Sequence, residues 1–233
     1  MIWAVVLAAG ESLRMGRQKL LLPFGDTTIA GAVVATAAAA RVDGVLVVLG
    51  ADREAIRSEI GSRAGDGHSV GSGRVAGGGR PAHSPRLVVP PDGAAGPDKR
   101  KPDIAFAVND DYRLGMLTSI QAGLKALPEG ARAAVIMLGD QPFLTARVVD
   151  AVVAAYEKGR PGLVIPTFQG RRGHPVLIDL KYKDEVLALD PLDGLRALVR
   201  AHADDILEVH TGDANILRDL DTPEDYAGLP KVN

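Results

Sequence analysis

Two cations follow the first strand-like run of the chain, at a spacing suited to binding phosphate. Residues 2–25 read IWAVVLAAGESLRMGRQKLLLPFG, in which an apolar, β-branched run gives way to a loop containing Gly10, Arg14 and Lys19. Free backbone N–H groups of such a loop can surround phosphate oxygens while the two cations neutralise them. We therefore predict that this loop binds a polyanion. The alternative is a surface loop whose cations are only solvated.

Two common nucleotide-binding loops are excluded at this position. A P-loop requires Ser or Thr after its lysine, and Lys19 is followed by Leu20. A dinucleotide-binding fingerprint requires three glycines spaced G-x-G-x-x-G, whereas this loop contains only Gly10 and Gly16. The loop is therefore expected to belong to another class of nucleotide-binding protein.

A candidate metal ligand follows a second apolar run, residues 133–138. The segment L-G-D-Q-P places Asp140 at the carboxyl end of this predicted strand. In open α/β sheets, ligands bind at the carboxyl ends of strands, so Asp140 is expected to face the cationic loop. Mg²⁺ prefers oxygen ligands and usually needs only one or two carboxylates, because water and phosphate complete its coordination. The alternative is an aspartate that only forms a turn before Pro142.

The C-terminal segment 219–225, D-L-D-T-P-E-D, predicts the start of a helix. Thr222 suits the N-cap, with Pro223 at the first helical position and Asp225 completing a capping box. This interpretation leaves Asp221 without a structural reason, because it lies just outside the helix.

The first loop resembles the signature L-A-A-G-x-S-x-R-M-G-x-x-K of the MobA-like nucleotidyltransferases, with every fixed position filled. The segments 109–124, 138–142, 173–175 and 219–225 also occur in the order expected of that family. The resemblance implies a set of nucleotide-binding residues drawn from these segments. That set comprises Leu7, Ala8, Ala9, Gly10, Glu11, Ser12, Arg14, Met15, Gly16, Lys19, Asn109, Gly115, Ser119 and Gly139.

The same resemblance implies roles for the charged residues. Lys19, Arg14 and Asp140 are expected to be catalytic. Asp221 is expected to be a second Mg²⁺ ligand beside Asp140, with Asp219 as its rival.

The resemblance also places an acceptor-binding set on the other side of the cleft. That set comprises Gln141, Gly173, His174 and Pro175.

For Asn109, contact with the base or ribose competes with a plainer interpretation, in which Asn109 or Thr118 caps the following helix.

Within this family, Ala8-Ala9-Gly10 together with G-D-Q-P and G-H-P is most similar to the molybdenum cofactor cytidylyltransferases. Guanylyltransferase relatives usually carry L-A-G-G, and the extra methyl of Ala9 would favour a smaller pyrimidine. The resemblance implies Mg²⁺-dependent transfer of CMP from CTP to the terminal phosphate of a phosphorylated pterin, molybdopterin or the molybdenum cofactor, with pyrophosphate released. A molybdoenzyme is a candidate recipient.

Three alternatives stay open at this point. The first is GTP as the donor. The second is another phosphorylated acceptor, such as a sugar phosphate, methylerythritol phosphate or a phospho-acid. The third is a non-catalytic module that delivers the cofactor.

Composition narrows the class of protein. The chain has 233 residues, 46% of them hydrophobic, which suits one large domain. The net charge of −2 argues against a nucleic-acid partner, and the absence of cysteine excludes disulfides and thiolate chemistry. No apolar stretch reaches the roughly 20 residues of a membrane span, and no signal peptide is evident, so we expect a cytoplasmic protein without a membrane partner.

The elements that must position these residues alternate between strand-like and helix-like patterns. We therefore expect an α/β fold, a single three-layer Rossmann-like nucleotidyltransferase domain over residues 1–233 with a mostly parallel sheet. Asp26 or Thr27 is expected to cap a helix on which Ile29, Val33, Val34 and Ala37 share one face. The predicted strands are residues 2–7, 45–49, 104–108, 133–138, 163–165, 175–178 and 206–209. Further helices are predicted at residues 52–60, 117–127 and 146–156.

Residues 62–103 break this alternation. Fifteen of these 42 residues are Gly or Pro, so the segment cannot bury enough apolar surface to offset the entropy of ordering it. We predict a flexible surface insertion, with residues 87–89 as a brief strand. The alternative is a basic lid over an anionic substrate.

Overall fold

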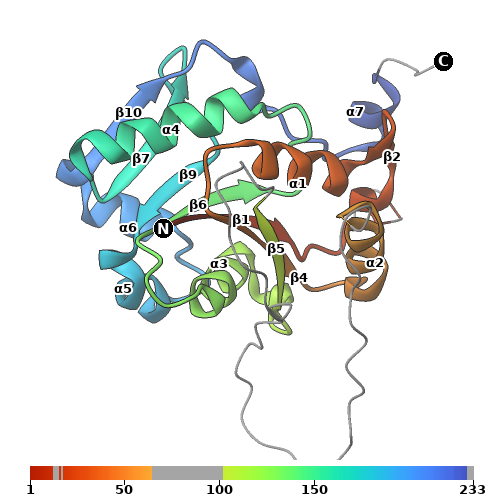
Figure 1. The fold of residues 1–233 in the computed structure, drawn as a ribbon, viewed down its shortest axis with the longest axis horizontal. Helices are drawn as coiled ribbons and strands as arrows, with labels where there is room; N and C mark the ends of the chain where they lie inside the picture. Colours follow the sequence, from red (N-terminus) through yellow and green to blue (C-terminus); the bar gives the residue numbers. More distant parts are fainter. Residues whose placement is uncertain (13–15, 17, 65–101, 230–233) are drawn as a thin grey trace, which may run out of the picture.

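The computed structural model describes residues 1–12, 16, 18–64 and 102–229. An eight-stranded sheet lies at its centre, in the order β10-β7-β9-β6-β1-β4-β5, with β8 paired to β7 (Figure 1). The pairs β1–β4, β1–β6, β4–β5 and β7–β10 are parallel, whereas β9 runs antiparallel to β6 and β7. The predicted mostly parallel α/β sheet is confirmed.

The strands of this sheet are β1 (Ile2–Ala8), β4 (Gly44–Leu49), β5 (Asp103–Val108), β6 (Ala133–Leu138), β7 (Leu163–Phe168), β8 (Arg171–Arg172), β9 (Val176–Asp179) and β10 (Ile206–His210). The α-helices are α1 (Ile29–Ala39), α2 (Arg53–Ala64), α3 (Met116–Ala126), α4 (Ala146–Gly159), α5 (Lys183–Ala188), α6 (Arg196–Ala201) and α7 (Pro223–Ala227). The seven strands predicted outside residues 62–103 therefore all form, within a residue or a few of their predicted ends.

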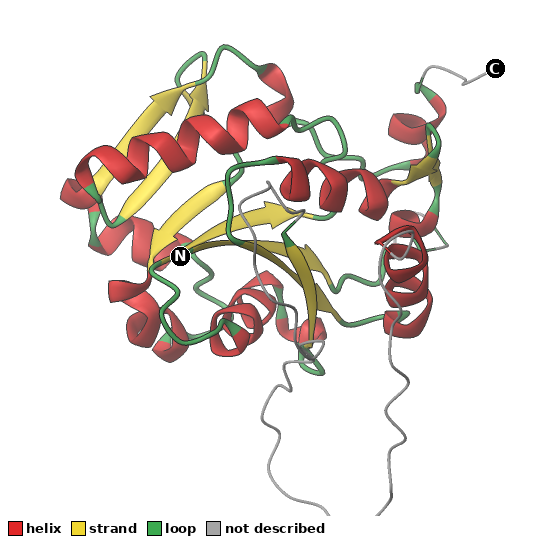
Figure 2. Ribbon diagram, viewed as in Figure 1, coloured by secondary structure: helices red, strands yellow, loops and turns green. Residues whose placement is uncertain are grey.

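Helices cover both faces of the sheet and make three layers (Figure 2). Along β1, Ala4 and Val6 pack in the same core cluster as α1, α2 and α4, whereas Val5 and Leu7 pack with α3, α5 and α6. Successive side chains of a strand point to opposite faces, so a strand buried on both faces reads as an unbroken apolar run.

The carboxyl ends of β1 and β6 lie side by side, and this places the site. Leu7 pairs in register with Leu138, and the N–H of Gly139 donates to the carbonyl of Leu7 at 3.0 Å. A Cβ at Gly139 would lie 2.6 Å from that carbonyl oxygen, so only glycine fits here. The loops that follow the two strands therefore leave the sheet next to each other.

The N-cap of α1 differs from the prediction. Thr28 caps the helix, its Oγ1 accepting from the N–H of Gly31 at 3.1 Å, so the predicted cap at Asp26 or Thr27 is wrong. Thr27 instead pairs with Phe24 in a short hairpin of β2 (Pro23–Phe24) and β3 (Thr27–Thr28). The chain therefore stays extended until Thr28.

The C-terminal segment packs against this hairpin and the loop after β6. The hydroxyl of Tyr226 donates to the carbonyl of Pro23 at 2.8 Å, and the Arg218 guanidinium lies 3.7 Å from the ring centroid of Phe143. The predicted capping box of Thr222 is confirmed at the start of α7. These contacts bring residues 219–221 beside residues 139–141.

The predicted insertion falls mostly outside the described residues. Its first residues, 62–64, end α2, and Asp103 starts β5, whereas 65–101, including the proposed strand at 87–89, are not described. Within the described ranges, no helix has the length and apolar character needed to cross a membrane.

Candidate active site

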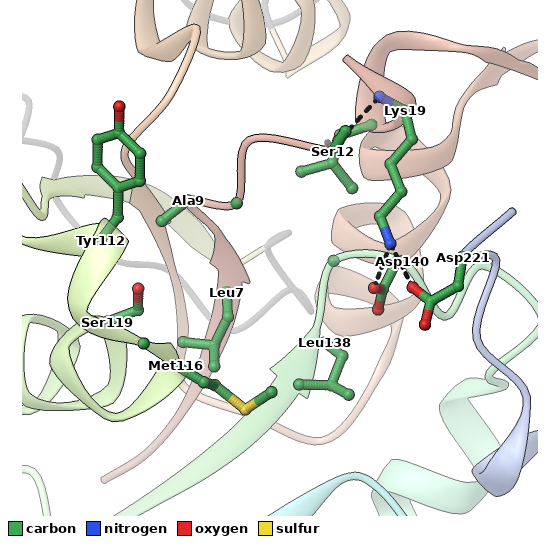
Figure 3. Close-up of a pocket in the computed structure, with 14 residues that line it drawn as sticks. Leu7, Ala9, Ser12, Lys19, Tyr112, Met116, Ser119, Leu138, Asp140 and Asp221 are labelled. Atoms are coloured by element: carbon green, nitrogen blue, oxygen red, sulfur yellow. Dashed lines mark hydrogen bonds and ion pairs between the residues drawn. The ribbon is translucent and has the colours of Figure 1, made fainter. Parts of the chain in front are cut away.

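A pocket of about 390 Å³ opens at the carboxyl ends of β1 and β6 (Figure 3). Such a volume is within the range of small-molecule sites. The pocket is lined by Leu7, Ala9, Gly10, Ser12, Lys19, Leu20, Tyr112, Gly115, Met116, Ser119, Leu138, Gly139, Asp140 and Asp221. Ten of these fourteen belong to the twenty predicted site residues, so half of the predicted set meets in one place.

Lys19 lies between two carboxylates at one end of the pocket. Its Nζ donates to Asp140 Oδ2 at 2.7 Å and to Asp221 Oδ1 at 2.7 Å (Figure 3). The three residues come from positions up to 202 apart in the chain. One cation and two anions gathered at a pocket mouth are suited to binding a charged ligand together with a counter-ion.

Lys19 stays charged in this setting. Burial acts to lower the pKa of Lys19, but the carboxylates of Asp140 and Asp221 together outweigh it and leave the pKa raised above its ordinary value. A positively charged side chain is therefore held at the pocket at neutral pH.

One backbone and one side-chain hydrogen bond hold the segments that carry Asp140 and Asp221 together. The N–H of Leu220 donates to the carbonyl of Asp140 at 3.0 Å, and Leu220 itself is buried in the core. Beside it, Gln141 Nε2 donates to Asp219 Oδ1 at 2.6 Å. The segments 139–141 and 219–221 are thus joined by two hydrogen bonds, both made by residues that directly precede Asp221.

Of the two rival carboxylates, Asp221 is the one that meets Lys19. Asp219 turns instead toward Gln141, and its burial raises its pKa above the ordinary value, more than the hydrogen bond from Gln141 lowers it. Asp219 is also absent from the pocket lining. The geometry therefore favours Asp221 over Asp219 as the partner of Asp140.

The carboxylate pair fits a hard divalent cation. Asp140 Oδ1 is buried, and no hydrogen-bond partner for it occurs in the described part of the chain. No group of three or more metal-ligating side chains occurs in that same part. Two carboxylates suffice for a cation that takes its remaining oxygen ligands from water and phosphate.

The α3 side of the pocket is organised by a buried asparagine. Asn109 Nδ2 donates to the hydroxyl oxygens of Thr118 and Ser119 at 2.9 Å each, and its Oδ1 accepts from the N–H of Asp111 at 3.0 Å. Asn109 is 5% exposed and does not line the pocket. Its side chain supports the start of α3 and orients Ser119, which does line the pocket. The predicted capping by Asn109 or Thr118 is wrong, because Gly115 is the N-cap of α3 and no side chain caps it.

Glu11 closes one rim of the pocket by pairing with the segment before α3. Its Oε1 accepts from Arg113 Nε at 2.7 Å and from the hydroxyl of Tyr112 at 3.2 Å. The hydrogen bonds from Arg113 hold the pKa of Glu11 below its ordinary value. The Glu11 carboxylate therefore fixes the position of Tyr112, one of the lining residues.

Several predicted nucleotide contacts lie outside the pocket wall. Ala8 is fully buried, because β1 continues through it, and it does not line the pocket, so its nucleotide contact stays a prediction. Gly16 is exposed with φ of 63° and does not line the pocket. Arg14 and Met15 lie outside the described residues.

Four lining residues were not among the predicted site residues. They are Leu20, Tyr112, Met116 and Leu138. Three are aliphatic side chains and one is a tyrosine, and none carries a charge that would distinguish it from a core residue. Their position within the quoted motif segments was the only available signal.

The predicted acceptor-binding residues form a separate group beside the pocket. The N–H of Gly173 donates to Pro166 O, the N–H of His174 donates to Ile216 O, and the His174–Pro175 peptide is cis. None of these residues, nor Gln141, lines the pocket. Their predicted contact with an acceptor stays a prediction.

We expect His174 to make stability depend on pH. Burial lowers the pKa of His174 below its ordinary 6.5, and the charge of Asp140 opposes only part of this effect. The unfolded chain then binds the proton more readily, so the free energy of unfolding falls as pH drops below 6.5. Denaturant titration at about pH 8 and about pH 5.5 should show a smaller drop in His174→Gln than in wild type. An equal drop in the free energy of unfolding for wild type and His174→Gln would show that His174 does not cause the pH dependence.

Comparison with known proteins gives a consistent result. A family model described as the MobA-like NTP transferase domain matches residues 4–77 and 72–206. Purine catabolism protein PucB of Bacillus subtilis (strain 168) is 30% identical over 226 residues, which cover 95% of this chain and 92% of that protein. The molybdenum cofactor cytidylyltransferase of Escherichia coli (strain K12) is 28% identical over 125 residues, 53% of this chain and 61% of that protein.

Solved structures share the fold over nearly the whole chain. The Mycobacterium tuberculosis Rv0371c homologue from Mycobacterium sp. strain JC1 superposes with a TM-score of 0.70 at 26% identity, covering 97% of this chain and 93% of that one. Rv0371c of Mycobacterium tuberculosis H37Rv in complex with manganese superposes with a TM-score of 0.65 at 22% identity, covering 97% and 96%.

Proposed function

The chain belongs to the MobA-like NTP transferase family and is a nucleotidyltransferase, and from this premise we propose that it transfers CMP from CTP to the terminal phosphate of molybdopterin or the molybdenum cofactor, releasing pyrophosphate. The observation that carries the proposal is the position of Lys19 between Asp140 and Asp221 at the pocket mouth. The name of the Escherichia coli relative supports CTP as donor and the pterin as acceptor.

The acceptor phosphate supplies its own nucleophile. A phosphate monoester has a second pKa of about 6, so at neutral pH it is already mostly the dianion and needs no general base. One of its oxygens forms a bond to the α-phosphorus of CTP while the bond from that phosphorus to the β-phosphate oxygen breaks. The enzyme therefore has to align two anions that repel each other and stabilise the charge on the leaving pyrophosphate.

The first loop and the two carboxylates divide this task. Lys19 and Arg14 hold the β- and γ-phosphates, and the backbone N–H groups of Gly10, Glu11 and Ser12 donate to phosphate oxygens. Asp140 and Asp221 are the residues that would hold Mg²⁺ or another divalent cation. When bound, such a cation supplies positive charge that reduces the repulsion between the two reacting phosphates.

The methyl group of Ala9 is expected to favour CTP over GTP. Ala9 is 4% exposed and lines the pocket, so removing its methyl group would enlarge the space open to a base. One methyl group in a pocket is worth about 1–3 kcal/mol, so Ala9→Gly should shift the ratio of kcat/KM for CTP to that for GTP by about tenfold toward GTP. Ala8→Gly is the matched control, because Ala8 is fully buried and does not line the pocket. The proposal for Ala9 fails if both variants keep the wild-type ratio.

Pyrophosphate release across a matrix of donors and acceptors tests the function itself. The purified chain is assayed with each of the four common NTPs against molybdopterin, the molybdenum cofactor, a hexose phosphate and methylerythritol phosphate, with Mg²⁺, with Mn²⁺ and with EDTA. We expect the highest kcat/KM for CTP with a pterin acceptor, and loss of activity in EDTA. If the enzyme prefers a sugar phosphate or methylerythritol phosphate, that compound replaces the pterin as the assigned acceptor. Binding of CTP without turnover on any acceptor would overturn the transferase proposal.

A further inference from the structure

The side chain of Gln18, which precedes Lys19, joins both ends of the nucleotide loop. Its Oε1 accepts from Ser12 Oγ at 2.8 Å and from the N–H of Leu20 at 3.4 Å. Its Nε2 donates to the carbonyl of Gly10 at 3.2 Å and to Asp52 Oδ2 at 3.0 Å. A primary amide offers two donors and one oxygen with two lone pairs, so all of its hydrogen-bonding capacity is used.

These four partners fix which way the amide points. If the oxygen and nitrogen exchanged places, two donors would face N–H and O–H groups, and the oxygen would face a carbonyl and a carboxylate. Ser12 in turn accepts from the backbone N–H of Lys19 at 3.0 Å. Ser12 has φ of 54°, a left-handed conformation that costs a non-glycine residue energy and persists where its surroundings enforce it. Gln18 is a main part of those surroundings.

The loop is also tied to the turn between β4 and α2. The N–H of Ala51 donates to the carbonyl of Ala9 at 3.1 Å, and Asp52 accepts from Gln18. A Cβ at Gly50 would lie 2.6 Å from the Ala9 carbonyl oxygen, so the two backbones are in close contact. The start and the end of the loop therefore rest on the same turn, the start through a backbone bond and the end through Gln18.

We propose that Gln18, oriented by Asp52, is a positioning residue that holds Gly10, Ser12 and Lys19, at the two ends of the loop, in their phosphate-binding positions before the nucleotide arrives. The inference rests on the proposed function, because it assigns the loop to the NTP phosphates. Gln18 does not itself line the pocket, and it supports the lining residues Gly10 and Ser12 from behind. Gln18 thereby holds Ser12 and the Lys19 side chain where the ligand binds, so that neither residue has to become ordered when the ligand arrives.

A positioning role predicts a specific change in the kinetics. Without Gln18 the loop must be ordered each time a nucleotide binds, and that entropy is subtracted from the affinity. Once the nucleotide is bound, Lys19, Asp140 and Asp221 are unchanged, so the chemical step is affected less. A change in ground-state binding raises KM with a smaller effect on kcat. We therefore expect Gln18→Leu to raise KM for the NTP by about tenfold, with kcat within about threefold of wild type.

A second glutamine supplies the matched control. Gln121 Nε2 donates to the carbonyls of Val186 and Leu189 at 3.0 Å each and supports α5, away from the nucleotide loop. Gln121→Leu also removes side-chain hydrogen bonds, here partly buried ones, so it should lower the Tm while leaving KM for the NTP unchanged. Steady-state kinetics are measured for both variants with the NTP that wild type uses best, beside thermal unfolding.

Asp52 variants test the same contact without altering the loop. Asp52→Asn keeps an oxygen that can accept from Gln18 and should stay within about twofold of the wild-type KM, whereas Asp52→Ala should raise KM by several-fold. Gln18→Leu combined with Asp52→Ala should be no worse than Gln18→Leu alone, because both changes remove one shared contact. A wild-type KM in Gln18→Leu, or an equal rise in Gln121→Leu, would overturn the inference while the transferase function stands. Absence of NTP turnover in the wild type would overturn both.

Discussion

Replacing Asp140 with asparagine is expected to lower kcat by about 10²–10³-fold while leaving the fold intact. Asparagine keeps the shape of the side chain and one acceptor for Lys19, but it removes the negative charge. The fold contact at this position is the backbone carbonyl of Asp140, which accepts from Leu220 and is unaffected by the substitution. The loss should therefore appear in turnover and in cation binding, and little in Tm.

The measurement pairs kinetics with a cation-binding assay. We expect Asp140→Asn to weaken Mn²⁺ binding in the presence of CTP, detected by electron paramagnetic resonance, together with the loss of kcat. Asp204→Asn is the control, because Asp204 is exposed at the amino end of the edge strand β10, whereas the pocket lies at the carboxyl ends of the central strands β1 and β6. Turnover at the wild-type rate in Asp140→Asn would remove Asp140 from the catalytic set.

The core of the fold could be predicted because each central strand is covered on both faces. β1, β4 and β6 read as unbroken apolar runs, and this pattern follows directly from burial on two sides. The two-residue strands β2, β3 and β8 are too short to carry any periodicity. The cap at Thr28 was missed for the same reason, since the hairpin that delays α1 is fixed by pairing between Phe24 and Thr27.

The site was predictable where charge follows a strand. Lys19 and Asp140 each follow a buried run, and parallel neighbours bring the ends of such runs to one edge of the sheet. Asp221 follows no such run in the sequence. It reaches the site because Leu220 bonds to the backbone of Asp140 across a separation that no local pattern encodes, and only the family resemblance indicated it.

The sequence alone could not show whether a polar residue in a motif contacts the ligand or holds a neighbouring residue in place. Asn109 and Gln141 were predicted to contact ligand, and in the structure their amides donate to Ser119 and Asp219, so each supports a neighbouring residue while its ligand contact stays a prediction. Gln18 was passed over although its amide organises the loop. An amide side chain has the same chemistry in both situations, so the distinction depends on contacts that only the folded chain defines.

Replacing Lys19 with methionine is expected to lower kcat/KM for the NTP by at least about 10²-fold and to make the protein more responsive to divalent cations. Methionine is similar in length but carries no charge. Asp140 and Asp221, each 2.7 Å from the same Nζ, would then face each other without the cation between them. Removing one partner of a partly buried ion pair costs about 1–3 kcal/mol, less than for a fully buried pair because water screens the charges.

The expected thermal behaviour distinguishes this role from a purely structural one. In metal-free buffer Lys19→Met should unfold at a lower temperature than wild type. Mg²⁺ or Mn²⁺ without nucleotide should then raise the Tm of the variant more than that of wild type, because Lys19 no longer competes with the metal for the two carboxylates. Lys125→Met is the control, since Lys125 is exposed on α3 and should show neither effect. Equal metal-dependent shifts in wild type and Lys19→Met would mean that Asp140 and Asp221 do not hold the cation. Full activity in Lys19→Met would remove the lysine from phosphate binding.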